Sequence, residues 1–296
     1  MKKQIFTGCA TALITPFDAS TENVDFSAFE DLIRFQINNG TDALVISGTT
    51  GESPVLSAKE KEGLLDIAIN ASRNRLPLIM GTGSNDTKTA VIKSNEAEKK
   101  GVDGLLIVTP YYNKATQEGI IRHYNFIADR VSTPIIVYNV PSRTGVNIQP
   151  ETYLALSEHK NIVAIKEANG DISAAAKTIA LCKNKLDIYS GNDDQTVAMM
   201  SLGAKGVISV AGNIIPSVMH KICRAMLSGN ISTANKLQAE YLELINFLFC
   251  EVNPIPVKAA CEMIFGCNSA LRLPLTPITE KNKNKLKTLL GKYKLI

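Results

Sequence analysis

The stretch Gly40-Thr-Asp-Ala-Leu-Val-Ile46 recurs as Gly101-Val-Asp-Gly-Leu-Leu-Ile107, with glycine, aspartate and an apolar run in the same order. In each copy the glycine is placed to end a helix, and the apolar run has the length and composition of a buried strand. The same order of helix end, turn and strand start therefore occurs twice in the sequence. It predicts units in which parallel strands alternate with helices.

The same alternation extends through about the first 210 residues. Asp25 is placed to cap the first helix, and Ser57-Ala-Lys-Glu60 has the capping-box pattern at the start of the next one. Eight units favour a closed (β/α)₈ barrel over an open doubly wound sheet, because no glycine-rich phosphate loop follows the first strand. The predicted strands span residues 8–14, 42–46, 77–80, 103–108, 134–138, 162–166, 186–190 and 206–210, and the helices expected between them include 116–130 and 193–202.

The strand pattern stops near Ile214, and only helices are predicted beyond it. We therefore predict a barrel carrying the active site over residues 1–213. Residues 214–296 are predicted to form a barrel-completing helix and a C-terminal helical extension. The helix expected at 231–249 carries more apolar surface than one barrel helix needs, so it is expected to pack on the barrel or on another subunit. The predicted helices span 216–227, 231–249, 256–265 and 280–293.

Composition indicates an ordinary globular protein that binds neither nucleic acid nor membrane. The 296 residues are 45% hydrophobic and 20% charged, with a net charge of +4 and no clustered basic and aromatic face. The N-terminus lacks an apolar signal region, and no apolar run is long enough for a membrane span. Six cysteines without a C-x-x-C pair and three scattered histidines predict no disulfide framework and no metal site. We expect free thiols in a cytoplasmic protein.

The stretch Ile162-Val-Ala-Ile-Lys166 is an apolar run that ends in a lysine. Such a lysine is either an end-cap that reaches water or a reactive amine in a dry site. In a (β/α)₈ barrel the active site lies at the carboxyl ends of the strands. Other strand ends carry Gly48-Thr-Thr-Gly-Glu52, Thr109-Pro-Tyr-Tyr-Asn113 and Tyr138-Asn-Val-Pro141, with Arg143 close behind. We expect these groups to meet Lys166.

A lysine beside tyrosine hydroxyls, without a metal cluster or cofactor loop, favours Schiff-base chemistry on a carbonyl substrate. The turn Gly48-Thr-Thr-Gly51 offers backbone N–H groups and hydroxyls suited to a carboxylate. An ordinary strand-to-helix turn without a binding role would have the same sequence pattern. Tyr138 taken alone would equally fit packing. Two rival amines, Lys205 and Lys258, lie in a turn and beside a helix start, and are interpreted as solvated.

At five motifs the chain resembles the dihydrodipicolinate synthase family of the pyruvate-dependent class I aldolase superfamily. The resemblance runs from about Thr7 to the C-terminus. The motifs that carry it are Gly48-Thr-Thr-Gly-Glu52, Thr109-Pro-Tyr-Tyr-Asn113, Tyr138-Asn-Val-Pro-Ser-Arg-Thr-Gly145, Ile165-Lys-Glu-Ala168 and Asn253-Pro-Ile-Pro-Val-Lys258.

The resemblance implies roles for the catalytic residues. Lys166 forms a Schiff base with pyruvate, so no separate cofactor is expected. Tyr138 shuttles protons, relayed through Thr49 and Tyr112. In the family the residue at Tyr112 comes from the neighbouring subunit, so a dimer is the minimal active unit and a dimer of dimers is the expected homotetramer.

The resemblance also implies the substrates. Thr50, with Thr49, holds the pyruvate carboxylate, and the main chain of Ile208 lies nearby. Arg143 binds the carboxylate of L-aspartate 4-semialdehyde, giving 4-hydroxy-tetrahydrodipicolinate for diaminopimelate and lysine biosynthesis. Related sugar-acid aldolases, similar to N-acetylneuraminate lyase, share the lysine and tyrosine but tend to lack this arginine. A sugar-acid aldolase and a barrel without catalysis remain alternatives.

The resemblance includes a pocket where some family members bind L-lysine as a feedback inhibitor. This chain is similar to those members at Ser53, Asn85 and Tyr111.

The same pocket departs from the lysine-inhibited pattern at Ala58, Lys61 and Thr89. Lysine-inhibited members tend to have two polar, often histidine, residues and a glutamate there. Losing an acidic partner and gaining a cation should repel the ammonium groups of L-lysine. We predict weak or absent inhibition.

Overall fold

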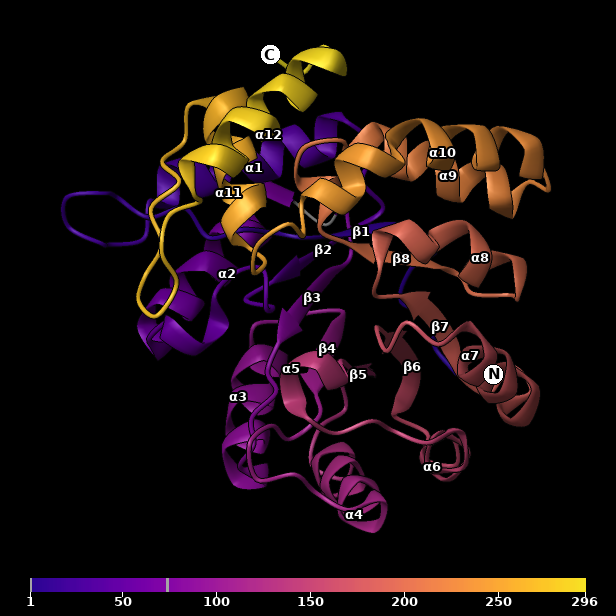
Figure 1. The fold of residues 1–296 in the computed structure, drawn as a ribbon. Coiled ribbons are helices and arrows are strands. Elements are labelled where there is room, and N and C mark those ends of the chain that lie inside the picture. Colours follow the sequence, from indigo (N-terminus) through magenta and orange to yellow (C-terminus); the bar gives the residue numbers. More distant parts are fainter. Residues whose placement is uncertain (1, 73–74) are drawn as a thin grey trace.

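A computed structural model describes residues 2–72 and 75–296. In this part of the chain eight parallel strands follow one another around a closed barrel, so the predicted (β/α)₈ architecture is confirmed (Figure 1). The strands are β1 (Gly8–Ala12), β2 (Ala43–Ile46), β3 (Leu78–Gly81), β4 (Gly104–Val108), β5 (Ile135–Asn139), β6 (Ile162–Glu167), β7 (Asp187–Ser190) and β8 (Gly206–Ser209).

Helices surround the barrel and continue past its last strand (Figure 1). Within the described residues each is too short or too polar to cross a bilayer. The α-helices are α1 (Phe26–Asn38), α2 (Ala58–Ser72), α3 (Thr87–Lys99), α4 (Gln117–Ala128), α5 (Pro141–Thr144), α6 (Pro150–Leu156), α7 (Ile172–Cys182), α8 (Thr196–Ser201), α9 (Pro216–Leu227), α10 (Ile231–Phe247), α11 (Ile255–Phe265) and α12 (Glu280–Lys292). Short 3₁₀ helices are η1 (Ser53–Val55), η2 (Asp193–Gln195) and η3 (Ala211–Asn213).

The repeated stretches adopt the same local structure. Gly40 and Gly101 have φ of 80° and 82°, a left-handed conformation that glycine adopts without steric cost. The aspartate two residues later accepts a backbone N–H from the preceding strand. Asp42 accepts from Cys9 over 2.8 Å, and Asp103 accepts from the N–H of Leu78 over 2.9 Å. Each aspartate therefore ties a new strand to its neighbour at the bottom of the barrel.

Helix caps follow the sequence signals. Asp25 accepts a hydrogen bond from the N–H of Ala28 over 2.9 Å, which caps α1. Ser57 and Glu60 form the reciprocal capping box of α2, with hydrogen bonds of 2.8 Å and 3.3 Å.

Some predicted bounds were wrong. The first strand ends at Ala12 instead of residue 14, and α4 is shorter than 116–130. The continuous helix expected at 193–202 is a 3₁₀ turn followed by α8. The first turn of the expected helix is a separate 3₁₀ turn, because the carboxylate of Asp193 accepts hydrogen bonds from the backbone N–H groups of Val210 and Ala211.

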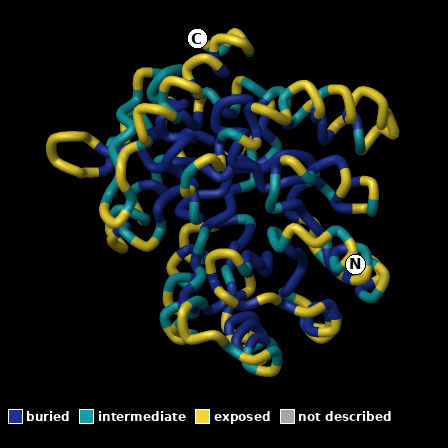
Figure 2. The backbone as a smooth tube through the Cα atoms, in the orientation of Figure 1, coloured by how far each residue is buried: buried dark blue, intermediate teal, exposed yellow. Residues whose placement is uncertain are grey.

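Apolar side chains alternate between two layers, as β2 illustrates. Val45 points into the barrel, where it packs with Ala10, Ile79 and other interior residues. Leu44 and Ile46 point outward and pack under the helices. Both faces of the strand are buried, which explains why it reads as a continuous apolar run. Figure 2 shows this buried interior enclosed by more exposed helices.

The C-terminal helices form an extension on one side of the barrel (Figure 1). Helix α9 packs on β1 and β8, whereas α10 packs on α8 and α9. The rings of Tyr241 on α10 and Tyr293 after α12 stack with centroids 5.0 Å apart. The helical extension is thus observed, although the proposed division at residue 213 stays a prediction.

Candidate active site

Lys166 and Tyr138 lie side by side at the carboxyl ends of neighbouring strands. Their Cα atoms are register partners between β6 and β5. Both residues are almost fully buried, with exposed fractions of 5% and 6%. Lys166 Nζ lies 4.3 Å from the centroid of the Tyr138 ring. The barrel therefore holds an amine and a phenol in direct contact in a largely water-excluded position.

The turn after β2 carries Thr49 and Thr50. It is tight, because the N–H of Gly51 donates to the carbonyl of Gly48 over 3.2 Å, and that of Glu52 donates to Thr49 over 3.1 Å. In the described part of the chain, no acceptor meets the N–H groups of Thr49 and Thr50. N–H groups left free in a turn, beside hydroxyls, suit an anion such as a carboxylate.

Arg143 lies on the short helix α5, directly after β5. Its guanidinium donates to the backbone carbonyl of Asn253 over 2.9 Å. The side-chain amide of the same asparagine donates to Thr50 Oγ1 over 3.0 Å. Asn253, which precedes α11, therefore joins the arginine loop to the threonine turn. Asn253 belongs to one of the motifs that carry the family resemblance, but nothing in the sequence alone indicated a role for it.

A cavity of about 180 Å³ opens between these elements. This is about six times the volume that one water occupies in the liquid. Among the residues that line it are Thr49, Thr50, Tyr138, Arg143, Lys166, Gly191, Asn192, Val210, Phe249 and Asn253.

Two predicted site residues do not line this cavity. Tyr112 is 91% exposed and has φ of 72°, an unusual backbone conformation for a bulky residue. Its side chain is open to solvent and does not line the cavity that holds Lys166. Ile208 is fully buried among the barrel-interior residues, and Val210 lines the cavity instead.

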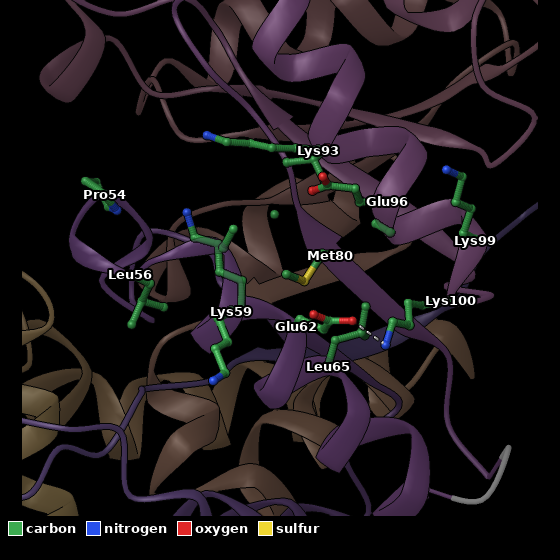
Figure 3. Close-up of a pocket in the computed structure, with 15 residues that line it drawn as sticks. Pro54, Leu56, Lys59, Glu62, Leu65, Met80, Lys93, Glu96, Lys99 and Lys100 are labelled. Atoms are coloured by element: carbon green, nitrogen blue, oxygen red, sulfur yellow. Dashed lines mark ion pairs between the residues drawn. The ribbon is translucent and has the colours of Figure 1, made fainter.

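Four of the six residues predicted for the regulatory pocket line two further cavities, the larger of which is shown in Figure 3. A cavity of about 360 Å³ is lined by Ser53, Lys61 and Tyr111. A second one, of about 600 Å³, is lined by Ala58 and also by Lys61. Asn85 and Thr89 line neither of them: the backbone carbonyl of Asn85 accepts from Asn113, and the Thr89 hydroxyl donates to Asp86.

Lys258 was wrongly interpreted as solvated. Its side chain is fully buried, and its Nζ lies 2.7 Å from Oε1 of Glu52. The amine also donates to the carbonyl of Ala270 and lies 4.2 Å from the centroid of the Phe17 ring. Glu52 has φ of 54°, so a strained residue at the end of the threonine turn is held by a buried ion pair. Because its amine is engaged in this ion pair, Lys258 is not a candidate for the reactive lysine.

Sequence reasoning also missed Asp193. This fully buried carboxylate accepts N–H groups from Val210 and Ala211 over 2.9 Å and 3.1 Å. Burial raises its pKa, while the nearby Lys166 charge acts in the opposite direction. The only feature of the sequence that pointed to Asp193 was its position, as an acidic residue, after the seventh predicted strand.

Glu167 stabilises strands β5 and β6 on their outer side. It follows Lys166 on β6 and faces outward, where Oε1 accepts from the Asn139 amide over 2.9 Å and Oε2 from Tyr153 over 2.8 Å. Burial raises the pKa of Glu167 to about 7 despite these hydrogen bonds.

No cluster of three or more histidine, cysteine, aspartate or glutamate side chains within residues 2–72 and 75–296 is placed to hold a metal ion. The six cysteines of that part are unpaired.

A (β/α)₈ barrel with a buried lysine and tyrosine at the strand ends defines an enzyme of the class I aldolase type. A model of the dihydrodipicolinate synthetase family matches residues 5–293, and the chain belongs to this family. It is 51% identical over 292 residues to 4-hydroxy-tetrahydrodipicolinate synthase 1 of Clostridium acetobutylicum, covering 99% of both chains.

Solved structures agree with this assignment. Dihydrodipicolinate synthase from Thermotoga maritima superimposes with a TM-score of 0.97 at 41% identity, covering 99% of this chain and 100% of the other. The chloride-inhibited dihydrodipicolinate synthase from Acinetobacter baumannii, solved with pyruvate, gives a TM-score of 0.97 at 40% identity with the same coverage.

Proposed function

We propose that the protein condenses pyruvate with L-aspartate 4-semialdehyde to give 4-hydroxy-tetrahydrodipicolinate, in lysine and diaminopimelate biosynthesis. The observation that carries this proposal is one cavity lined by Lys166, Tyr138, the threonine turn and Arg143. It supplies an amine, a proton carrier and two places for carboxylates. The family membership and the names of the relatives support the same reaction.

The first half of the reaction forms a covalent adduct on the protein itself, so no further cofactor is proposed. The Lys166 amine attacks the carbonyl carbon of pyruvate, and loss of water leaves an imine. Tyr138, in contact with the amine, carries protons to and from the departing oxygen. The Thr49–Thr50 turn holds the pyruvate carboxylate. Loss of a methyl proton then gives the enamine.

The second half joins the two substrates. The enamine carbon attacks the aldehyde of L-aspartate 4-semialdehyde, and a carbon–carbon bond forms. Arg143 holds the carboxylate of that substrate, because a guanidinium matches a carboxylate with two hydrogen bonds. The substrate amino group then displaces Lys166 as the ring closes, which restores the free amine. The aldehyde partner of a sugar-acid aldolase has no such small carboxylate for Arg143 to hold, so the sugar-acid aldolase alternative is not favoured.

The exposure of Tyr112 supports a shared active site. Tyr112 is 91% exposed, so most of its side chain does not pack on its own chain. Its φ of 72° is a backbone conformation that a bulky residue adopts only at a steric cost. We propose that it completes the proton relay of a second copy, that this dimer is the active unit, and that two such dimers form a homotetramer. Unpaired cysteines support a reducing, cytoplasmic setting.

A coupled assay tests the proposed function. The protein should turn over pyruvate with L-aspartate 4-semialdehyde and should not cleave N-acetylneuraminate. Arg143→Ala should lose activity mainly through a higher KM for the semialdehyde, while Arg122→Ala, an exposed arginine on α4, should behave as the wild type. Cleavage of N-acetylneuraminate with no condensation would contradict the proposal.

A further inference from the structure

Glu167 and Asn139 form a hydrogen-bonded pair next to the Lys166–Tyr138 contact. Each follows one of those two residues in its strand, and their Cα atoms are the next register partners between β6 and β5. Because successive side chains of a strand point to opposite faces, the pair lies on the outer side of the barrel wall. The amide of Asn139 donates to Oε1 of Glu167 over 2.9 Å, and both side chains are buried. A side-chain hydrogen bond therefore joins the two strands one residue beyond the amine.

The carboxylate of Glu167 is held from two further directions. Its Oε2 accepts a hydrogen bond from the hydroxyl of Tyr153, on α6, over 2.8 Å. Its Oε1 also accepts the backbone N–H of Asn169 over 2.9 Å. Tyr153 is 1% exposed, so its hydrogen bond is shielded from water. The Glu167 side chain thus connects β5, β6, α6 and the loop after β6.

Asn139 has fixed partners of its own. Its amide also donates to Oδ1 of Asn147 over 2.8 Å, and its Oδ1 accepts the backbone N–H of Ile148 over 3.2 Å. These hydrogen bonds tie the segment before α6 to the end of β5. A shift of either strand end would break several of them at once, and each buried polar group left unpaired is costly.

The observed network fits the carboxylate form of Glu167. Asn139, Asn169 and Tyr153 all donate to it. A protonated carboxyl must donate its own hydrogen, and among these three partners the Tyr153 oxygen is the group that can accept one. The hydroxyl hydrogen of Tyr153 would then have to turn away from Glu167. Protonation therefore changes the network.

Burial acts against the carboxylate form. It raises the pKa of Glu167 to about 7, although the hydrogen bonds from Tyr153 and the other donors act in the opposite direction. The other titratable groups on this side of the barrel wall are the phenols of Tyr153, on α6, and Tyr124, on α4. Burial raises the pKa of both phenols, so they stay neutral. On the β7 side the register partner of Glu167 is Ser190, which does not titrate, and Lys166 points to the opposite face of β6.

We propose that Glu167 is a positioning residue for the reaction: as a carboxylate it fixes the ends of β5 and β6 so that Tyr138 faces the Lys166 amine, and on protonation it no longer does so. The inference rests on the proposed imine chemistry and adds a residue that does not touch the substrate. Imine formation should respond to it, because that step needs the amine and the phenol in one geometry. Binding of the pyruvate carboxylate at the Thr49–Thr50 turn should respond little.

The rate of imine formation with pyruvate alone tests this role. The adduct is trapped with borohydride after short reaction times, between about pH 5.5 and about pH 9, and quantified by mass spectrometry of the full-length protein. Glu167→Gln keeps the shape and cannot ionise. The ratio of the wild-type rate to the rate of this variant removes the pH dependence that both share. It should rise from about one to about ten, the effect of a small misplacement, with its midpoint near the pKa of about 7. The pyruvate concentration that gives half the maximal rate should stay within about twofold.

Tyr153→Phe gives a second test that leaves Glu167 in place. Loss of one donor raises the pKa of the carboxyl, so the pH response should move upward by about half a unit to one unit. Relative to the wild type, this variant should therefore be slowest between about pH 7 and about pH 8. Tyr124→Phe is a matched control, because it removes a buried hydroxyl that donates instead to the carbonyl of Ile107 over 2.9 Å. It should leave the midpoint unchanged.

Two results would overturn the role of Glu167. One is a ratio of wild-type to Glu167→Gln rates that is constant over this pH range. The other is a Tyr153→Phe rate that differs from the wild type by the same factor at every pH. A wild type that forms no adduct with pyruvate would overturn the proposed function and this role together. A failure of the positioning role alone is therefore distinguishable from a failure of the reaction.

Discussion

The side-chain amide of Asn253 donates a hydrogen bond to Oγ1 of Thr50 over 3.0 Å, although 203 residues separate them. The carbonyl of the same asparagine accepts from Arg143 over 2.9 Å. One residue before α11 thus fixes the proposed pyruvate turn and the proposed arginine clamp relative to one another. The C-terminal part of the chain is therefore part of the site as well as of the scaffold.

Replacing Asn253 should impair binding of pyruvate. Asn253→Ala removes the hydrogen bond to Thr50, which corresponds to about 1 kcal/mol or a roughly fivefold higher KM for pyruvate. Asn253→Asp should raise this KM further, because its charge repels the substrate carboxylate. Steady-state kinetics with saturating semialdehyde provide the measurement. A KM for pyruvate that is unchanged in both variants would refute this role.

Breaking the Lys258–Glu52 ion pair should destabilise the fold. Lys258→Met leaves a buried, unpaired carboxylate at Glu52, and we expect a loss of about 3–5 kcal/mol in the free energy of unfolding. The double variant Lys258→Met/Glu52→Gln removes that charge and should regain much of the loss. Urea unfolding measures both. If the double variant is less stable than Lys258→Met, the ion-pair account is wrong.

Glu167 should make stability depend on pH. Its pKa is raised by burial from 4.5 to about 7, so the folded protein binds more protons than the unfolded chain between these values. Stability from this group is therefore lost as pH rises through that window. The contribution should fall by about 2 kcal/mol between about pH 5.5 and pH 8.

The variant Glu167→Gln keeps the shape and removes the ionisation. Relative to the wild type it should gain stability as pH rises, and the difference should follow the titration of Glu167. Unfolding free energies of both proteins at the two pH values provide the measurement. Parallel pH curves for the two proteins would show that another group is responsible.

L-Lysine should inhibit the enzyme weakly or not at all. Lys61 places a cation in the cavity that Ser53 and Tyr111 line, and Thr89 supplies no carboxylate for an ammonium group. The double variant Lys61→His/Thr89→Glu should therefore gain sensitivity. Activity measured against L-lysine concentration tests this. Half-inhibition of the wild type below the millimolar range would contradict it.

The barrel and the position of Lys166 at one of its strand ends were predictable from local patterns. Strands such as β2 are buried on both faces, so they appear as apolar runs that end in recognisable turns. Lys166 ends one of these runs, and barrel topology places every such end on the same rim. Its contact with Tyr138 follows from the pairing of β5 with β6.

The residues that support the site were not predictable in the same way. Lys258 lies beside prolines at a helix start, where lysines usually reach water, and its partner Glu52 is 206 residues away in sequence. Asn253 and Asp193 likewise act on backbone or side-chain groups of distant segments. The packing of the C-terminal helices on the barrel brings Lys258 and Asn253 to their partners, whereas the neighbouring carboxyl ends of β7 and β8 bring Asp193 to Val210.

The most direct test of the account is to trap the covalent adduct. Incubation with pyruvate followed by borohydride reduction should add one reduced pyruvyl group, and peptide mass spectrometry should place it on Lys166. Lys166→Arg should take up no label. A label on Lys205 or Lys258, or an unlabelled protein that still condenses the two substrates, would contradict the central claim.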